Sequence, residues 1–266
     1  TTNLMGTFKD LDYFEWAKEM DVVSWDNYPG MDTPPSFTAM CHDLMRGIGG
    51  NKPFMLMEQT PSQQNWQPYN SLKKPGQMRA QSYQTVAHGA DTIQFFQLRR
   101  SVGGCEKFHG AVIAHAGTAD TRVFCEVTQL GKELEKIGSR VMGSENHAKV
   151  GIIFDWENYW ALEYTSGPNR DLRYVDQIEQ MYNYFYNKNI AVDMIPIDAD
   201  FSKYDLVAAP VLYMVKDGVA ESLEAYVQAG GTLITTYMSG IVGQSDNVHL
   251  GGYPGPLRKI DRKSVV

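Results

Sequence analysis

The sequence predicts an α/β protein with parallel β-strands, and three observations lead to that prediction. Short apolar runs alternate with helix-like stretches along the 266 residues, an order that builds parallel strands joined by crossover helices. Several of these runs end in polar or aromatic residues, as strands do at the ligand-binding edge of such sheets. The rhythm changes near residue 144, which predicts two domains, residues 1–143 and 144–266.

The first region alternates four expected strands with four expected helices. The strands are at residues 1–6, 21–26, 53–58 and 91–98, and the helices at 11–20, 36–47, 75–89 and 119–137. A complete (β/α)8 barrel takes about 250 residues, so the region is either a small four-stranded unit or half of a barrel. Its long, aromatic-rich loops suit the lining of a deep pocket and favour the half barrel.

The second region has the rhythm of a doubly wound α/β domain. Strands are expected at 150–154, 191–197, 205–214 and 232–237, and helices at 171–188 and 219–229. The last helix ends at Gly230-Gly231, a typical stop. No glycine-rich phosphate loop follows the first strand, which argues against a dinucleotide site. Trp156, Tyr159 and Trp160 are more consistent with a packing or interface patch.

Composition excludes several classes of protein. Hydrophobic residues make up 43% and charged residues 21%, as in globular proteins rather than disordered chains. The net charge of −7 argues against a nucleic-acid partner. The strongest apolar run, 206–215, contains Pro210 and is shorter than the ~20 residues that span a bilayer, so no membrane partner is expected.

Cys41, Cys105 and Cys125 form no C-x-x-C pair and are expected to be buried free thiols, with no metal site.

Glu58 is the sharpest candidate for catalysis. It ends the apolar run 53–57, and a carboxylate at the mouth of a parallel strand can act as a nucleophile or as a general acid/base. The alternative is a glutamate that caps the following turn. The next loop carries Asn65, Trp66 and Tyr69, which suit stacking and hydrogen bonding to a sugar ring.

Glu106 and His109 form an E-x-x-H pair after the fourth expected strand. Such a pair can be part of a metal site on a helix, but no second pair exists and the neighbouring glycines argue against a helix. Hydrogen bonding to substrate hydroxyls is the better functional interpretation. A surface pair without function is the alternative that spacing alone favours.

Together these segments resemble the β-galactosidases of glycoside hydrolase family 42, over essentially the whole chain. The segments that carry the resemblance are residues 1–6 (TTNLMG), 21–29 (DVVSWDNYP), 57–62 (MEQTPS) with Asn65-Trp66, 95–100 (FFQLRR) with Glu106 and His109, 154–162 (FDWENYWAL), and 251–255 (GGYPG). The resemblance implies strands five to eight of a TIM barrel, followed by a glutamine-amidotransferase-like α/β domain used in trimerisation. Amidotransferase activity itself is excluded, because no cysteine follows Cys125.

The resemblance also assigns site residues. It implies that Glu58 is the nucleophile of a retaining mechanism and that Trp66 is a wall of the galactose subsite. It implies that Glu106 and His109 bind galactose hydroxyls and that Tyr28 approaches the nucleophile. No cofactor is expected, and the family implies a β-galactoside substrate, a homo-oligomer and a cytoplasmic location.

The sequence departs from the family pattern in what it lacks. The family's acid/base glutamate follows an asparagine at the end of the fourth barrel strand, upstream of every segment present here. We therefore expect a portion of a β-galactosidase that is inactive by itself. The alternative is a non-catalytic galactoside-binding or assembly module. The three cysteines do not match the zinc-binding cluster that some members carry.

Overall fold

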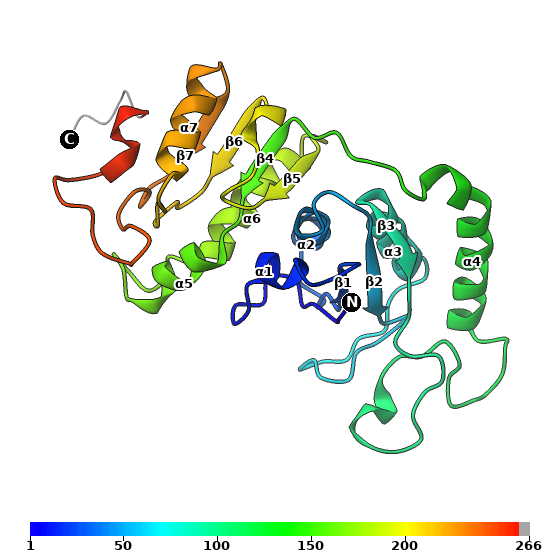
Figure 1. Ribbon diagram of the computed structural model, residues 1–266. Coiled ribbons are helices and arrows are strands. Elements are labelled where there is room, and N and C mark those ends of the chain that lie inside the picture. Colours follow the sequence, from blue (N-terminus) through cyan, green and yellow to red (C-terminus); the bar gives the residue numbers. More distant parts are fainter. Residues whose placement is uncertain (261–266) are drawn as a thin grey trace. The chain divides into compact units, whose positions relative to one another are not determined.

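The computed structural model describes residues 1–260 and divides the chain into two compact units (Figure 1). The first unit contains residues 1–6 and 17–146, and the second contains residues 7–16 and the chain from His147 onward. The expected boundary at residue 143 lies close to this division. Residues 7–16 nevertheless pack with the second unit, and residues 261–266 of the expected second domain lie outside the described residues.

The first unit is built on a parallel sheet whose strands follow one another in chain order. Its strands are β1 (Ser24–Asn27), β2 (Phe54–Gln59) and β3 (Ala90–Ile93). The expected strand at residues 1–6 is reduced to a single parallel bridge between Leu4 and Trp25. The expected strand at 91–98 stops at Ile93, although the N–H of Gln94 still donates to Leu56 O at 3.0 Å.

Helices cover this sheet close to where the sequence predicted them. They are α2 (Pro35–Ile48), α3 (Gln77–Ala87) and α4 (Arg122–Val141), with the 3₁₀ turn η1 (Cys105–Phe108) in the loop before α4. The expected helix at 11–20 is only α1 (Tyr13–Ala17). Met40, Leu44 and Met45 recur at helical spacing on α2 and are completely buried, together with Phe54 and Leu56 of β2.

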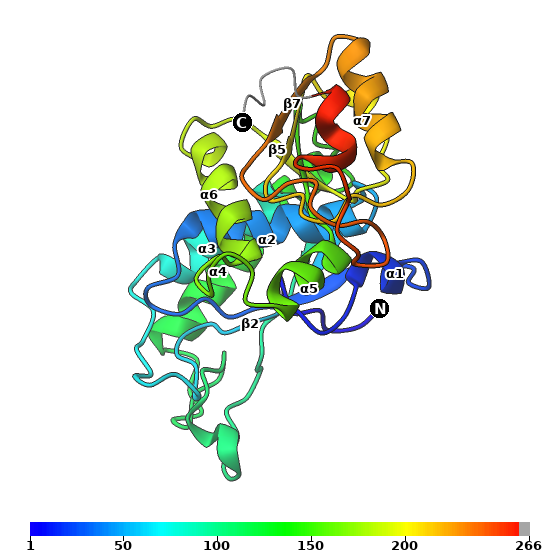
Figure 2. The ribbon, with the colours of Figure 1, turned by 90° about the vertical axis from the view of Figure 1, so that its left-hand side faces the viewer.

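The second unit has a parallel sheet in the order β5-β4-β6-β7, which is a doubly wound arrangement. The strands are β4 (Val150–Ile153), β5 (Val192–Ile195), β6 (Leu206–Ala209) and β7 (Thr232–Thr235). The helices are α5 (Trp156–Tyr164), α6 (Tyr174–Tyr186) and α7 (Val219–Gln228), with 3₁₀ turns η2 (Phe201–Lys203) and η3 (Gly255–Lys259). Figure 2 shows α6 and α7 on opposite sides of the sheet.

Aromatic residues on α5 explain why residues 7–16 belong to the second unit. Trp156 is completely buried, and its ring lies 5.2 Å from that of Tyr13. Its indole N–H donates to Phe8 O at 2.9 Å, and the indole N–H of Trp160 donates to Lys9 O. Trp156 and Trp160 therefore pack inside the second unit. This agrees with packing, one of the two roles (packing or interface) that the sequence suggested for these residues.

Asn158 of α5 ties the helix to the segment after β6. Its side chain is completely buried; Nδ2 donates to Val211 O at 2.9 Å and Oδ1 accepts from Met214 N at 2.8 Å. In sheets of this order, ligands bind beyond the carboxyl ends of the strands where the order reverses, here between β4 and β6. Asn158 bridges the segments that follow these two strands, and no glycine-rich phosphate loop is present.

The exposure of the cysteines differs from the expectation. The three cysteines are free, but only Cys41 is buried, whereas Cys105 and Cys125 are exposed. The expectation of three buried thiols is therefore wrong for two of them, because Cys105 lies in a polar loop and Cys125 on the outer face of α4, where both contact solvent.

Within residues 1–260, no helix combines the length and the apolar character needed to cross a membrane.

We expect Asn158→Ala to destabilise the chain by about 3 kcal/mol, because the buried N–H of Met214 loses its acceptor. Denaturant unfolding measures this difference. Asn187→Ala is the matched control, since Asn187 is exposed and bonds only to Asn183. Equal unfolding free energies for the two variants would contradict the role given to Asn158.

Candidate active site

Polar side chains gather at the carboxyl edge of the first sheet. Asp26 at the end of β1 and Glu58 near the end of β2 are register partners in the parallel pair. Asn3 reaches the same edge because the next residue, Leu4, is bridged to β1. The ends of parallel strands meet on one side of a sheet, so three side chains that are distant in sequence become neighbours.

Glu58 is held by two hydrogen-bond donors. The Tyr28 hydroxyl donates to Oε2 at 2.6 Å, and Nδ2 of Asn3 donates to Oε1 at 3.0 Å. The same Asn3 nitrogen lies 3.1 Å from both carboxyl oxygens of Asp26. Each oxygen of the Glu58 carboxyl group therefore has a donor that fixes its orientation.

Burial changes the protonation of the neighbouring groups. Burial first, and then the bond to Glu58, raises the pKa of Tyr28 far above its ordinary value, so the phenol remains a donor. Burial also raises the pKa of Asp26 to about 6, helped by the charge of Glu58 and opposed by the bond from Asn3. The strand edge therefore holds two carboxyl groups with different environments.

An aromatic wall stands beside Glu58. The rings of Trp66 and His109 are stacked, with centroids 5.2 Å apart and planes 22° apart. Tyr28 meets Trp66 edge-on at 4.9 Å and His109 at 5.8 Å. Trp66 is 51% exposed, which leaves part of its surface free for a ligand. Tyr69, from the same loop, is 80% exposed and makes none of these ring contacts.

Hydrogen bonds between two loops fix this wall. Asn65 Nδ2 donates to Cys105 O at 2.9 Å, and Asn65 Oδ1 lies 3.2 Å from Nδ1 of His109. The N–H of Gly110 donates to Gln63 O at 2.8 Å. The loop after β2 is thereby tied to the loop that contains η1, and the stacked rings are positioned before any ligand arrives.

The predicted E-x-x-H pair, Glu106 and His109, lies where these two loops are joined by hydrogen bonds. His109 is buried, which lowers its pKa, while the nearby charge of Glu106 acts in the opposite direction. Its Nε2 lies 3.2 Å from Phe96 O, so a neutral ring can donate either to this oxygen or to Asn65. Glu106 lies on η1, where its charge acts on both Tyr28 and His109. Among residues 1–260, no group of three or more His, Cys, Asp or Glu side chains could hold a metal ion.

The structure brings the five predicted residues into one neighbourhood. Tyr28 contacts Glu58, Trp66 and His109, and the charge of Glu106 acts on Tyr28 and His109. Asn3 and Asp26 had no predicted site role. A signal was present for Asp26, because it lies at the end of the strand expected at 21–26, whereas Asn3 lies inside the strand expected at 1–6. Nothing in the sequence indicated that one amide would bridge the two carboxyl groups.

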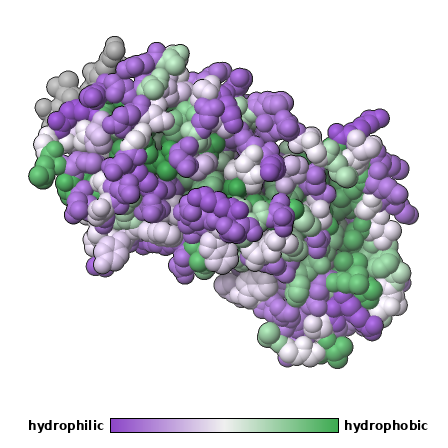
Figure 3. Space-filling model, in the orientation of Figure 1, coloured by the Kyte–Doolittle hydropathy of each residue, from purple (hydrophilic) through white to green (hydrophobic). Residues whose placement is uncertain are grey.

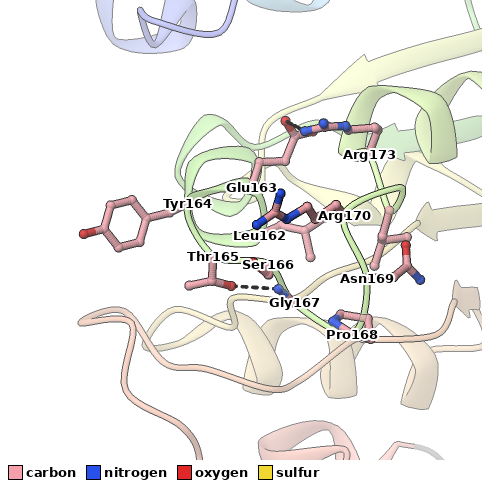
Figure 4. A pocket seen from close by; sticks show the side chains of 11 residues that line it. Leu162, Glu163, Tyr164, Thr165, Ser166, Gly167, Pro168, Asn169, Arg170 and Arg173 are labelled. Atoms are coloured by element: carbon pink, nitrogen blue, oxygen red, sulfur yellow. Dashed lines mark hydrogen bonds and ion pairs between the residues drawn. The ribbon is translucent and has the colours of Figure 1, made fainter.

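A separate cavity of about 250 Å³ lies in the second unit, in the loop after α5 (Figure 4). Residues 162–170, 172 and 173 line it. Thr165 accepts a hydrogen bond from Gly167 N, and Arg173 pairs with Glu163 at 3.3 Å. The side chains of the loop are mostly exposed and include no paired carboxyl groups, so catalysis is better placed at the strand edge.

Comparisons with known proteins show the family to which the chain belongs. A family model described as β-galactosidase matches residues 1–137, and a model described as the β-galactosidase trimerisation domain matches residues 148–262. The chain is 64% identical to β-galactosidase BgaA of Planococcus sp. (strain 'SOS Orange') and 56% identical to β-galactosidase LacZ of Lactobacillus acidophilus. These alignments cover 98% of this chain but only 38% and 39% of the two relatives.

Solved structures give the same result. The crystal structure of the β-galactosidase from Bacillus circulans sp. alkalophilus matches with a TM-score of 0.96 at 61% identity. That match covers 97% of this chain and 38% of the other. The chain therefore spans about two fifths of the length of the relatives that it matches.

We expect Gly110→Ala to loosen the tie between the loops, because an added Cβ would lie 2.5 Å from Thr60 Oγ1 and 2.8 Å from Gln63 O. Overpacking of this kind costs about 1–3 kcal/mol. Denaturant unfolding tests the loss, with Gly103→Ala as control, since a Cβ there meets nothing within 4 Å. If Gly110→Ala behaves like the control, the tie does not hold the loops.

Proposed function

Because this chain belongs to the β-galactosidases of glycoside hydrolase family 42, we propose that it supplies the nucleophile side of a retaining β-galactosidase. The observation that carries the proposal is Glu58 at the end of β2, held by Tyr28 and Asn3 next to the stacked rings of Trp66 and His109. A held carboxylate beside an aromatic face is the arrangement that a sugar-cleaving site requires.

In this mechanism, Glu58 attacks the anomeric carbon of a terminal β-galactosyl group. A second carboxyl group protonates the leaving oxygen, and water then cleaves the glycosyl-enzyme ester. The short bond from Tyr28 to Oε2 orients the carboxylate, which leaves Oε1 and its single Asn3 contact to meet the sugar. Oxocarbenium character in the transition state favours negative charge at this edge.

The remaining residues are proposed to hold the galactose. The exposed part of the Trp66 ring suits the apolar CH face of the sugar. Glu106 supplies an acceptor for hydroxyl groups. His109 is completely buried and both of its ring nitrogens lie at hydrogen-bond distance from protein oxygens, so it binds a hydroxyl group only when one of these contacts is exchanged for the sugar.

We infer that the first sheet is the part of a (β/α)8 barrel that contains strands five to eight. The bridge at Leu4 and the strands β1, β2 and β3 are parallel and consecutive, as barrel strands are. On α4, apolar residues recur at 123, 127, 130, 134, 137 and 141, yet only Leu130 is buried. Figure 3 shows apolar side chains gathered on the part of the first unit where α4 lies. Such a surface is what removal of neighbouring barrel elements would expose.

For the second unit, we propose a role in assembly of the full-length enzyme as a homo-oligomer, in keeping with the match to a trimerisation domain. Its strand order β5-β4-β6-β7 is compatible with a glutamine-amidotransferase-like fold, but the unit contains no cysteine to act as a nucleophile. We also propose a cytoplasmic location, because two exposed free thiols persist best in a reducing compartment.

We expect Glu58→Gln in the full-length enzyme to lower kcat by several orders of magnitude, because the covalent step is lost while the size of the side chain is kept. Hydrolysis of an aryl β-galactoside measures the loss. In Glu58→Gly, where the shortened side chain leaves room for it, azide should restore turnover and give the α-galactosyl azide. Glu135→Gln, at an exposed position on α4, should keep normal activity. Near-normal turnover of Glu58→Gln would remove Glu58 from the mechanism.

We expect the 266-residue chain to lack hydrolytic activity. Loss of a positioned general acid costs roughly 10²–10⁴-fold, and loss of part of the pocket costs more through poorer positioning of the sugar. An aryl galactoside with a good leaving group is the fairest substrate, since it needs little protonation. Turnover that disappears in Glu58→Gln would show that this chain holds a complete site. Galactose binding without turnover would favour the alternative, a galactoside-binding module.

A further inference from the structure

We propose that Asp26 is a positioning residue for the nucleophile: Asp26 and Glu58 form a coupled carboxyl pair bridged by the Asn3 amide, in which the charge of Glu58 favours the protonated form of Asp26. The proposal rests on the proposed function, because it assigns Asp26 to the same site. It adds to that function a second carboxyl group whose protonation responds to the charge of the nucleophile.

The geometry of the pair follows from the sheet. Asp26 and Glu58 are register partners on β1 and β2, so their side chains leave the sheet at the same level. One nitrogen, Nδ2 of Asn3, lies 3.1 Å from Asp26 Oδ1 and Oδ2 and 3.0 Å from Glu58 Oε1. The two carboxyl groups therefore approach within about 6 Å, where like charges in a partly buried site oppose double ionisation.

The two members of the pair have different donors. Glu58 accepts a short bond from the Tyr28 hydroxyl in addition to the Asn3 amide. Among the described residues, the Asp26 side chain accepts from Asn3, at 3.1 Å and shared between both of its oxygens. The bond from Asn3 favours the ionised form of Asp26, whereas burial and the charge of Glu58 oppose it.

The charges that face the pair come from several segments. Tyr28 follows β1, and its phenol remains protonated as described above. The charge of Glu106, from η1, acts on Tyr28 and His109, and Arg100 acts on His109. The influences on Asp26 are its burial, Asn3 and Glu58, and they raise its pKa to about 6. The Asp26 carboxyl group therefore titrates at mildly acidic pH.

Carboxyl ¹³C NMR of this chain labelled at aspartate tests the pair without requiring activity. The Asp26 signal, assigned by its loss in Asp26→Asn, should titrate near pH 6. In Glu58→Gln the midpoint should fall by about half a pH unit or more, because the like charge is gone. Asn3→Ala should raise it, because the hydrogen bond that lowers the pKa of Asp26 is lost, and this variant covers failure of Glu58→Gln to fold. A midpoint near 4, or one that neither variant moves, overturns the proposal.

The pH dependence of stability gives a second readout. Because folding raises the pKa of Asp26, the protonated form favours the folded state, and this contribution is lost as pH rises from about 4 to about 6. Asp26→Asn should remove that part of the dependence, whereas Asp32→Asn, at an exposed position, should keep it. An unchanged dependence in Asp26→Asn counts against the pair.

Kinetics of the full-length enzyme separate this proposal from the proposed function. The ionised pair stabilises oxocarbenium charge, so Asp26→Asn should lower kcat/KM at pH 7 roughly tenfold. It should also remove a step near pH 6 from the acidic side of the profile, and Asp32→Asn should not. If Glu58→Gln is inactive but the step persists in Asp26→Asn, the pair is wrong and the function stands. If Glu58→Gln is active, the function itself is wrong.

Discussion

The hydrogen bonds from one asparagine to two carboxyl groups depend on the register of the first sheet. Asp26 and Glu58 lie opposite each other only because β1 and β2 are parallel with that pairing. Asn3 reaches them because Leu4 is bridged to Trp25. Since side chains alternate between the two faces of a strand, a shift of one residue in either pairing would turn one partner away from the others. The chemistry proposed for this chain is therefore a consequence of backbone pairing.

The aromatic wall depends on a different constraint, the tie between the loops after β2 and β3. Long loops are usually the mobile parts of a protein. Here side-chain and backbone bonds hold them, through Asn65, Gln63 and Gly110. Gly110 is needed because the two segments approach too closely for a Cβ. The half-exposed Trp66 is thus flanked by loops that polar contacts hold together, which allows the proposed binding surface to be both open and rigid.

The second unit uses similar contacts for packing alone. Asn158 satisfies buried backbone groups beyond β6, and the indole N–H groups of Trp156 and Trp160 bond to residues 8 and 9. Buried amides and indoles of this kind are stable only when every polar atom has a partner. Polar and aromatic residues at strand ends therefore form the proposed site in the first unit and pack the structure in the second.

The sequence by itself determined the class of the fold, most of the helices and strands, and the five candidate residues Tyr28, Glu58, Trp66, Glu106 and His109. Hydrophobic periodicity predicts the fold class and its elements, and strand-end and loop positions indicate Glu58 and Trp66, because these are local properties of the chain. The site roles of Tyr28, Glu106 and His109 are instead what the resemblance to the family implies. Only the tertiary structure decided that residues 7–16 pack with the second unit, that the strand expected at 1–6 is a single bridge, and that Cys105 and Cys125 are exposed. It alone placed Asn3 between Asp26 and Glu58. These features depend on pairing between segments that are distant in sequence, and periodicity along one chain contains no information about which distant residues will meet.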